Sequence, residues 1–342
     1  RISDGLFTVE SDREEVVKLG EMALASKLDH LRARGPLTHY RFYLARRHQL
    51  LAQDKEEYDL DGFLKFFDFP SAEAAMKEDV GMTGMLCAVL AGDRHILEQL
   101  VALRADANSR VKGMGDLGYF DSQTLLMVAA KSHQDPRLLS TLIHLHADPN
   151  LMSRADIGPI WLARHPGHVR VLMAARADPS QSHPLNGVAG RGSADTVRAF
   201  LDSRCDPGQR SEDGFTPLLS IPLFGRSNPD AYETTRMLVA YRADVNCRAE
   251  TGMMSSYIAM AQMYVWIWGI EDAGRFWRWL ACMPGATPLS VAALTGDKGL
   301  VELLLELHAE VDIPNARGET PEMLARAVGQ NHVLPLLSTF AV

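Results

Sequence analysis

Histidine pairs and cysteines are the side chains of this sequence that most readily suggest chemistry. His144 lies two residues before His146, and His165 lies three before His168. Such pairs can begin a zinc site, but zinc needs further ligands at suitable geometry, and no cysteine lies near either pair. The four cysteines are widely separated, at positions 87, 205, 247 and 282, and form no CxxC pair. We therefore expect structural histidines, no metal centre and no disulfide framework.

A glycine-rich run could instead suggest a nucleotide. Residues 113–118, Gly-Met-Gly-Asp-Leu-Gly, match the pattern GxGxxG. A dinucleotide site needs a strand before this pattern and a βαβ unit around it. Here the run lies between two of the helical units described below, where glycines of a long turn explain it better. The P-loop, HExxH, GxSxG and kinase motifs are absent from the sequence, so we expect no catalytic residue, no enzyme activity and no cofactor.

Charge argues against a general nucleic-acid binder. The 342 residues carry 35 Lys and Arg against 43 Asp and Glu, a formal net charge of −8. A basic surface is needed to neutralise phosphates. Arginines and aromatic residues do interleave over 32–48, but five acidic residues follow between Asp54 and Asp61. A solvated amphipathic helix accounts for this segment, and no nucleic-acid partner is expected.

A four-residue pattern similar to Ala-Asp-x-Asn recurs along the chain, so the same local structure is expected at each copy. An Arg or His precedes the pattern every time. The six copies begin at Ala105, Ala147, Ala177, Cys205, Ala243 and Ala309. Asp and Asn favour turns, because their side chains bond the main chain two residues on. The pattern therefore predicts six similar turns.

A second signature lies upstream of these turns and begins with threonine. Thr216-Pro217-Leu218 and Thr287-Pro288-Leu289 are the clearest copies, and a glycine follows Thr287 after nine residues, at Gly296. Threonine caps helix N-termini, proline is tolerated at the first helical position, and glycine ends helices in a left-handed conformation. A leucine- and valine-rich stripe then predicts a second helix. Each unit is thus a helix pair followed by a turn.

These matches, in register over about 33 residues, resemble the ankyrin-repeat family and its T-P-L-H-x-A signature. The resemblance implies an all-α solenoid of helix pairs with hairpin fingers. We place seven repeats at 80–108, 119–150, 155–180, 183–208, 213–246, 285–312 and 317–340. The third is about three residues short and the fifth about five residues long. The histidine of the family signature is absent throughout, which predicts a less regular stack.

Three segments fall outside the repeat. Residues 1–79 show helical patterns, at about 11–34, at about 38–53 and after Ser71, and we expect them to cap the first repeat, since a solenoid end exposes apolar surface. Residues 109–120 form a long finger within the repeat domain, 80–342. Residues 248–284 fit either a diverged repeat or a helical insertion, and they hold four of the five tryptophans. Residues 252–270 are uncharged, but repeats on both sides argue against a membrane span, so membrane contact is not expected.

The family resemblance also implies a function. Ankyrin-repeat proteins bind protein partners along the concave face made by fingers and first helices, which predicts a non-catalytic scaffold or adaptor whose partner is another protein. Carried over position by position, the candidate contacts on this face are Arg110, Lys112, Asp116, Tyr119, Phe120, Lys131, Arg154, Asp156, Gln181, His183, Arg191, Arg210, Glu212 and Asp213. The tryptophan-rich segment offers a second surface, since aromatics and arginines dominate interface hot spots. Its candidates are Trp266, Trp268, Trp277 and Trp279.

Other interpretations stay open. The tryptophan-rich segment is also explained as a local core that serves folding alone. The chain as a whole is alternatively a structural subunit of a larger assembly, or an enzyme with an unrecognised site in 1–79 or 248–284. We expect a monomer or one subunit of a hetero-complex, in a reducing compartment. The cytoplasm fits best, and an organelle is possible because the sequence lacks an initiator Met.

Overall fold

The computed structural model describes residues 59–66, 69, 71–72, 83–111, 122–132, 135–154, 156–212, 214–250, 262–263 and 280–339. The chain divides into two compact units, Arg1–Pro159 and Ile160–Val342. Each is taken by itself below. The helices expected at 11–34 and 38–53 lie outside the described residues.

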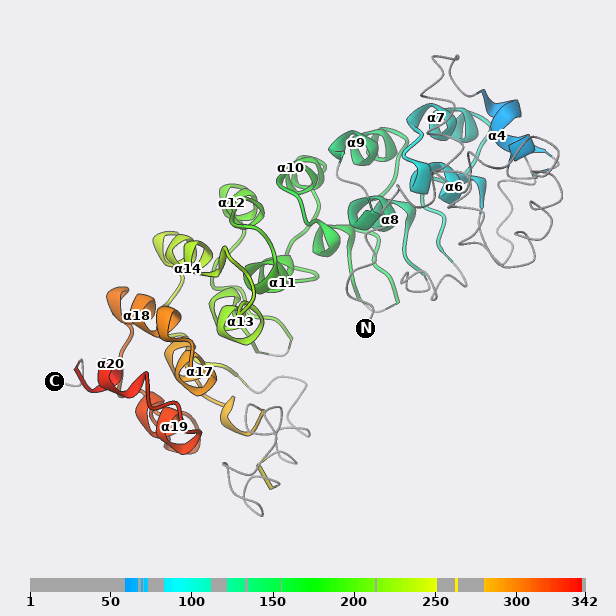
Figure 1. Cartoon of the computed structure of the whole chain (residues 1–342). Coiled ribbons are helices and arrows are strands. Elements are labelled where there is room, and N and C mark those ends of the chain that lie inside the picture. Colours follow the sequence, from blue (N-terminus) through cyan, green and yellow to red (C-terminus); the bar gives the residue numbers. More distant parts are fainter. Residues whose placement is uncertain are drawn as a thin grey trace, which may run out of the picture. The chain divides into compact units, whose positions relative to one another are not determined.

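Apart from α4, which precedes the repeats, the helices in the described residues occur as seven consecutive pairs (Figure 1). The first members are α6 (Gly84–Ala91), α8 (Leu125–Ser132), the 3₁₀ helix η2 (Pro159–Leu162), α11 (Pro184–Arg191), α13 (Pro217–Phe224), α17 (Pro288–Thr295) and α19 (Pro321–Ala327). The second members are α7 (Arg94–Ala102), α9 (Pro136–His144), α10 (Pro166–Ala174), α12 (Ala194–Asp202), α14 (Ala231–Ala240), α18 (Lys298–Glu306) and α20 (Leu334–Thr339). The predicted shortening of the third repeat appears as the four-residue η2.

The threonine signature begins the first helices as predicted. The hydroxyl oxygens of Thr83, Thr216, Thr287 and Thr320 each accept the main-chain N–H three residues on, at 3.1 to 3.4 Å. Second helices are capped in the same way by Asp93, Ser193 and Asp297. Each cap satisfies an N–H that has no partner within its helix.

The missing signature histidine is partly replaced by other polar side chains. Asn186 stands at that position in α11, and its amide donates to the carbonyl of Phe215 at 2.5 Å. Ser290 stands there in α17 and exchanges a hydrogen bond with the Thr287 hydroxyl at 3.0 Å. Both residues are buried. These two repeats therefore keep a polar link near the start of the first helix.

The Arg or His before each Ala-Asp turn ends a second helix. Arg104, His146, Arg176, Arg204, Arg242 and His308 all have positive φ, between 62° and 75°. In the fifth repeat, Arg242 N–H donates to Val239 and Ala243 N–H to Leu238, both at 2.9 Å. This is the Schellman ending, whose left-handed position is normally glycine. The recurring Arg/His-Ala-Asp pattern therefore marks the point where each second helix stops.

Helices of the same kind pack in rows. In residues 160–342, α11, α13, α17 and α19 contact one another in turn, while α10, α12 and α14 form the second row (Figure 1). In residues 1–159, α6 packs on α8 and α7 on α9. The core between rows consists mainly of buried leucine, alanine and valine. No unit buries its apolar face alone, so each repeat depends on its neighbours.

An additional helix precedes the repeats at a place where the sequence analysis expected none. Helix α4 (Leu60–Phe66) is capped by Asp59, whose carboxylate accepts the Gly62 N–H at 2.7 Å. It contacts α7, and its Phe63 side chain is fully buried. The sequence analysis missed this helix because most apolar residues of α4 follow immediately after the acidic residues of 54–61.

The two ends of the tryptophan-rich segment meet within one finger. Ala249 N–H donates to the Ala286 carbonyl, and Gly285 N–H to the Ala249 carbonyl, both at 2.9 Å. Helix α13 meanwhile contacts α17 directly. The residues on either side of 251–279 thus pair within one finger. Of the two interpretations left open for 248–284, we propose the insertion, because α13 and α17 are already in contact.

Candidate partner-binding surface

The fingers begin with tight turns built by the Ala-Asp-x-Asn pattern. The carboxylates of Asp106, Asp148, Asp178, Asp206 and Asp244 each accept the N–H two residues on, at 2.8 to 2.9 Å. The Ser180 hydroxyl also bonds Asp178, and together with the Ser180 N–H it holds the pKa of that carboxyl below its usual value. Five of the six predicted turns therefore share the same hydrogen bond, and the sixth has Glu310 in place of the aspartate.

Arginines four residues after the turn aspartate fasten the fingers to one another. The Arg110 guanidinium donates to the carbonyls of Ser122 and Met152, at 2.7 and 2.8 Å. Arg210 donates to the carbonyls of Gly214 and Arg248, at 3.4 and 2.7 Å. Each arginine thus bonds the opposite strand of its own finger and the equivalent residue of the next finger.

Arg248 repeats this arrangement at the base of the insertion. Its guanidinium donates to the Gly285 carbonyl at 3.2 Å and also to the Pro314 carbonyl. Arg110 and Arg210 were expected to contact a partner, and in the structure their guanidinium groups bond main-chain carbonyls. The sequence signal for this role was available, since all three arginines share one register position.

Other predicted contacts are exposed. Lys131 lies in the last turn of α8, and Arg154 and Asp156 lie on the finger that follows α9. In the second unit, Gln181, Arg191 and Glu212 are exposed and His183 is half-buried. The remaining candidates lie outside the described residues: Lys112, Asp116, Tyr119, Phe120, Asp213, Trp266, Trp268, Trp277 and Trp279.

An exposed aromatic residue that the sequence analysis missed lies beside one of these positions. Phe224 ends α13 with 44% of its surface exposed, and the Arg191 guanidinium lies 4.4 Å from the centre of its ring. This is a cation–π contact. A Cβ at Gly190 would lie 2.8 Å from the Ser220 carbonyl oxygen, so glycine lets α11 and α13 approach closely enough to form the pair.

The opposite, finger end of these first helices carries a mixed charge pattern. Arg210 forms an ion pair with Glu250 at 3.3 Å, and both side chains are partly exposed. Glu212 lies beside them in the sequence and is exposed. An eight-residue helix is about 12 Å long. The first-helix surface therefore runs about 12 Å from these finger charges to the Arg191–Phe224 pair.

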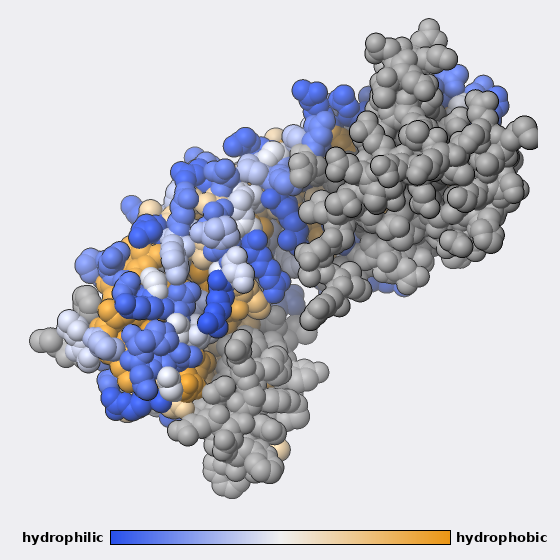
Figure 2. All heavy atoms as spheres, viewed as in Figure 1, coloured by the Kyte–Doolittle hydropathy of each residue, from blue (hydrophilic) through white to orange (hydrophobic). Residues whose placement is uncertain are grey.

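Two other exposed aromatic residues, both tyrosines, form hydrogen bonds through their hydroxyl groups. Tyr232 and Tyr241 are both 41% exposed, and their hydroxyls donate to Asp297 at 3.0 Å and to Asp202 at 2.6 Å. Figure 2 shows apolar residues reaching the surface among hydrophilic ones in the coloured part of the molecule. Phe224 differs from the two tyrosines because its ring carries no polar atom and has a guanidinium group over it.

The described cysteines are poor nucleophiles. All four are free and buried. Burial raises the pKa of Cys205 and of Cys247 to about 11, and it raises that of Cys87 further. Cys247 lines a pocket of about 100 Å³ between two fingers, where it shares a hydrogen bond of 3.1 Å with Thr216. A protonated thiol in so small a pocket provides no covalent chemistry at neutral pH.

Within the described ranges, no group of three or more His, Cys, Asp or Glu side chains is placed to hold a metal ion. His165 and His168 do lie together, with ring centres 5.2 Å apart. None of the helices in these ranges has the length and apolar character that a membrane span requires.

Comparison with known proteins agrees with the geometry. Residues 284–316 match the family model of the ankyrin repeat. The ankyrin-repeat domain of Bcl-3, a member of the IκB protein family, superposes with a TM-score of 0.54 at 19% identity, covering 76% of this chain and 100% of that one. The ankyrin-repeat domain of human ASB11 gives 0.53 at 16% identity, covering 74% and 96%.

The helix pairs, the finger turns and these matches confirm the predicted all-α solenoid fold. At such low identity the solved structures show the fold alone, and the family model adds the repeat itself. The chain thus has the fold of ankyrin-repeat domains, and residues 284–316 match the ankyrin repeat.

Proposed function

We propose that the chain is a non-catalytic interaction module that binds another protein along the first helices and fingers of residues 160–342. Ankyrin repeats generally mediate protein–protein interaction. The observation that carries the proposal is the Arg191–Phe224 pair, an exposed aromatic ring and a guanidinium in contact at 4.4 Å. Aromatic residues and arginine are the types that dominate binding energy at interfaces.

The charges at the finger end complete this proposed surface. A polar rim around an apolar centre is the usual anatomy of an interface. Arg210, Glu212 and Glu250 supply such a rim at one end of the first helices. Trp266, Trp268, Trp277 and Trp279, in the finger insertion that follows Glu250, are proposed as a second contact with the same partner.

The N-terminal residues have a supporting role in this proposal. Residues 1–79 cap the first repeat, and the contact between α4 and α7 supports that role. The repeat domain of 80–342 then carries the binding surfaces, with the segment 109–120 as its long finger.

Site-specific photo-crosslinking tests the proposed surface. A photoreactive phenylalanine analogue placed at Phe224 should crosslink a partner protein in cells. The matched control is the same analogue at Tyr241, an aromatic residue of similar exposure directly after the second helix α14. Adding Arg191→Ala should then reduce crosslinking from position 224. Equal crosslinking from 224 and 241, or none from 224, would contradict the proposal.

A further inference from the structure

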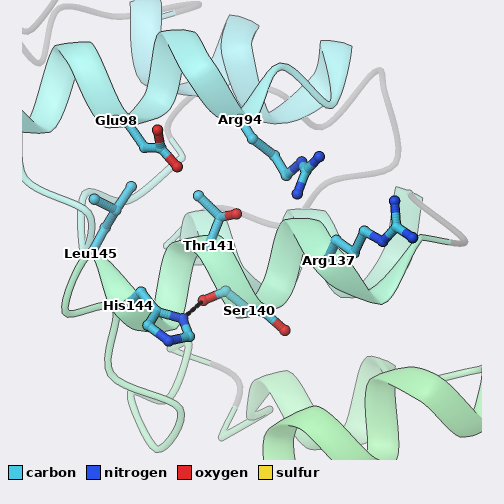
Figure 3. A pocket seen from close by; sticks show the side chains of 7 residues that line it. All are labelled: Arg94, Glu98, Arg137, Ser140, Thr141, His144 and Leu145. Atoms are coloured by element: carbon cyan, nitrogen blue, oxygen red, sulfur yellow. Dashed lines mark hydrogen bonds between the residues drawn. The ribbon is translucent and has the colours of Figure 1, made fainter.

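A pocket in the first unit lies between the second helices α7 and α9. Its volume is about 390 Å³. Arg94 and Glu98 enter it from α7, and Arg137, Thr141 and Leu145 line it from α9 and the residue after it. Figure 3 shows the two guanidinium groups at one end of the pocket and Glu98 with Leu145 at the other. One end of the pocket therefore carries positive charge and the other end carries negative charge.

Equivalent charges elsewhere in the chain are paired. In α18, Lys298 and Glu302 hold the positions that Arg94 and Glu98 hold in α7, and they form an ion pair at 3.5 Å. Between neighbouring second helices, Arg198 pairs with Glu233 at 3.1 Å, and Arg236 with Glu306 at 4.0 Å. In the second unit, these charged side chains are therefore neutralised by partners from the chain itself.

The α7–α9 pocket lacks such pairs within the described part of the chain. Arg94, Arg137 and Glu98 are exposed, and none forms a hydrogen bond or ion pair with another described side chain. The i,i+4 arrangement of Arg94 and Glu98 would permit an ion pair. Instead the Arg94 side chain turns toward the end of the pocket where Arg137 lies (Figure 3).

The helix dipoles add to the positive potential at this end. Arg94 is the first residue of α7 and Arg137 the second of α9. Helix N-termini carry partial positive charge, so cations are unfavourable there and anions favourable. The capping carboxylates of Asp93 and Asp135 offset part of this charge, although each already accepts a main-chain N–H, at 3.2 and 2.9 Å.

We propose that the α7–α9 pocket docks an acidic segment of a partner protein, with carboxylates held by Arg94 and Arg137. Guanidinium groups bind carboxylates through paired N–H donors. Glu98 sets the direction of the segment, because it repels a carboxylate at the opposite end. The chain's net charge of −8 repels acidic peptides at long range, so docking depends on this local group of cations.

Fluorescence anisotropy with a fluorescein-labelled octaglutamate peptide tests the proposal on the full chain. The double variant Arg94→Gln/Arg137→Gln should bind the probe about tenfold more weakly than the parent at about 50 mM salt, where screening is modest. Glu98→Gln should bind it about two- to threefold more tightly, since a like charge is removed. The matched control is Arg198→Gln/Arg236→Gln, which changes net charge equally and should stay within about twofold of the parent.

Three results would overturn the docking site. The parent could fail to bind the probe at about 1 mM. The two double variants could weaken binding equally, which would indicate a diffuse effect of charge. Inorganic phosphate could displace the probe at the same concentration as unlabelled octaglutamate, which would indicate a site for small anions. If the first double variant fails to fold, Arg94→Lys and Arg137→Lys replace it. These keep the charge but lose the paired donors, and each should weaken binding about threefold.

Discussion

Six residues with L side chains hold the left-handed conformation at the ends of second helices, where glycine is the usual choice. Left-handed backbone costs a residue with a Cβ about 1 kcal/mol or more. The chain accepts this cost six times, at Arg104, His146, Arg176, Arg204, Arg242 and His308. The Schellman hydrogen bonds and the buried Ala or Cys that follows each position determine the conformation. The strain is thus inherent in the repeat.

Glycine at one of these positions should therefore stabilise the fold. We expect Arg242→Gly to be about 1 kcal/mol more stable than Arg242→Ala, because both variants lose the same exposed side chain and only glycine relieves the left-handed strain. Urea denaturation of both variants measures this difference. Equal stability of the two variants would show that the position carries no strain. Arg170→Gly, in the exposed interior of α10, is the opposite control and should destabilise the fold by roughly 1 kcal/mol.

Contacts between fingers depend on arginines at one register position, and Arg248 is the most informative of them. Its guanidinium connects the two strands of its own finger to the finger that contains Pro314. Replacing it with methionine keeps much of the side-chain volume and removes these hydrogen bonds. Because the carbonyls are partly accessible to water, we expect a loss of about 1–2 kcal/mol. Denaturation experiments measure the loss.

Hydrogen exchange locates the effect of Arg248→Met. The amides of Ala249 and Gly285 close the base of this finger, so their exchange should accelerate in the variant while that of α11 stays unchanged. Arg236→Met is the control, since Arg236 forms an exposed ion pair of 4.0 Å with Glu306 and should contribute less than about 1 kcal/mol. Unchanged protection of Ala249 would show that the arginine does not fasten the finger.

The sequence predicted elements better than it predicted what their side chains do. Threonine caps and Asp turns are local, so their residue types predicted the helix pairs and finger turns directly. The roles of Arg110 and Arg210 depend on carbonyls of the next repeat, 42 and 38 residues away, and in the sequence only the register position that they share with Arg248 points to such partners. Phe224 was missed for a similar reason, because its exposure depends on how α13 packs against α11.

At the scale of the whole molecule, we propose that residues 251–279 are an insertion in the stack of repeats. The residues that flank them pair within one finger, and α13 packs directly on α17. The rejoining residues Leu280, Ala281 and Cys282 are buried, and the Cys282 carbonyl accepts a hydrogen bond from Asn315 at 3.3 Å. Residues 280–282 are therefore part of the stack, and we propose that it does not require residues 252–279.

Excision of residues 252–279 tests this conclusion. Joining Thr251 to Leu280 through a four-residue Gly-Ser turn should leave one cooperative unfolding transition. Shortening a connection of roughly 30 residues to four should even favour folding by about 1–2 kcal/mol through loop closure. Thermal unfolding followed by circular dichroism measures both properties. Leu289→Ala, at a fully buried position of α17, shows that the assay is sensitive, since it should cost about 2–5 kcal/mol. A broad transition or lost helicity after excision would mean that the tryptophan-rich segment is part of the core. A sharp transition would instead mean that the segment contributes little to folding, as expected of a surface kept for a partner.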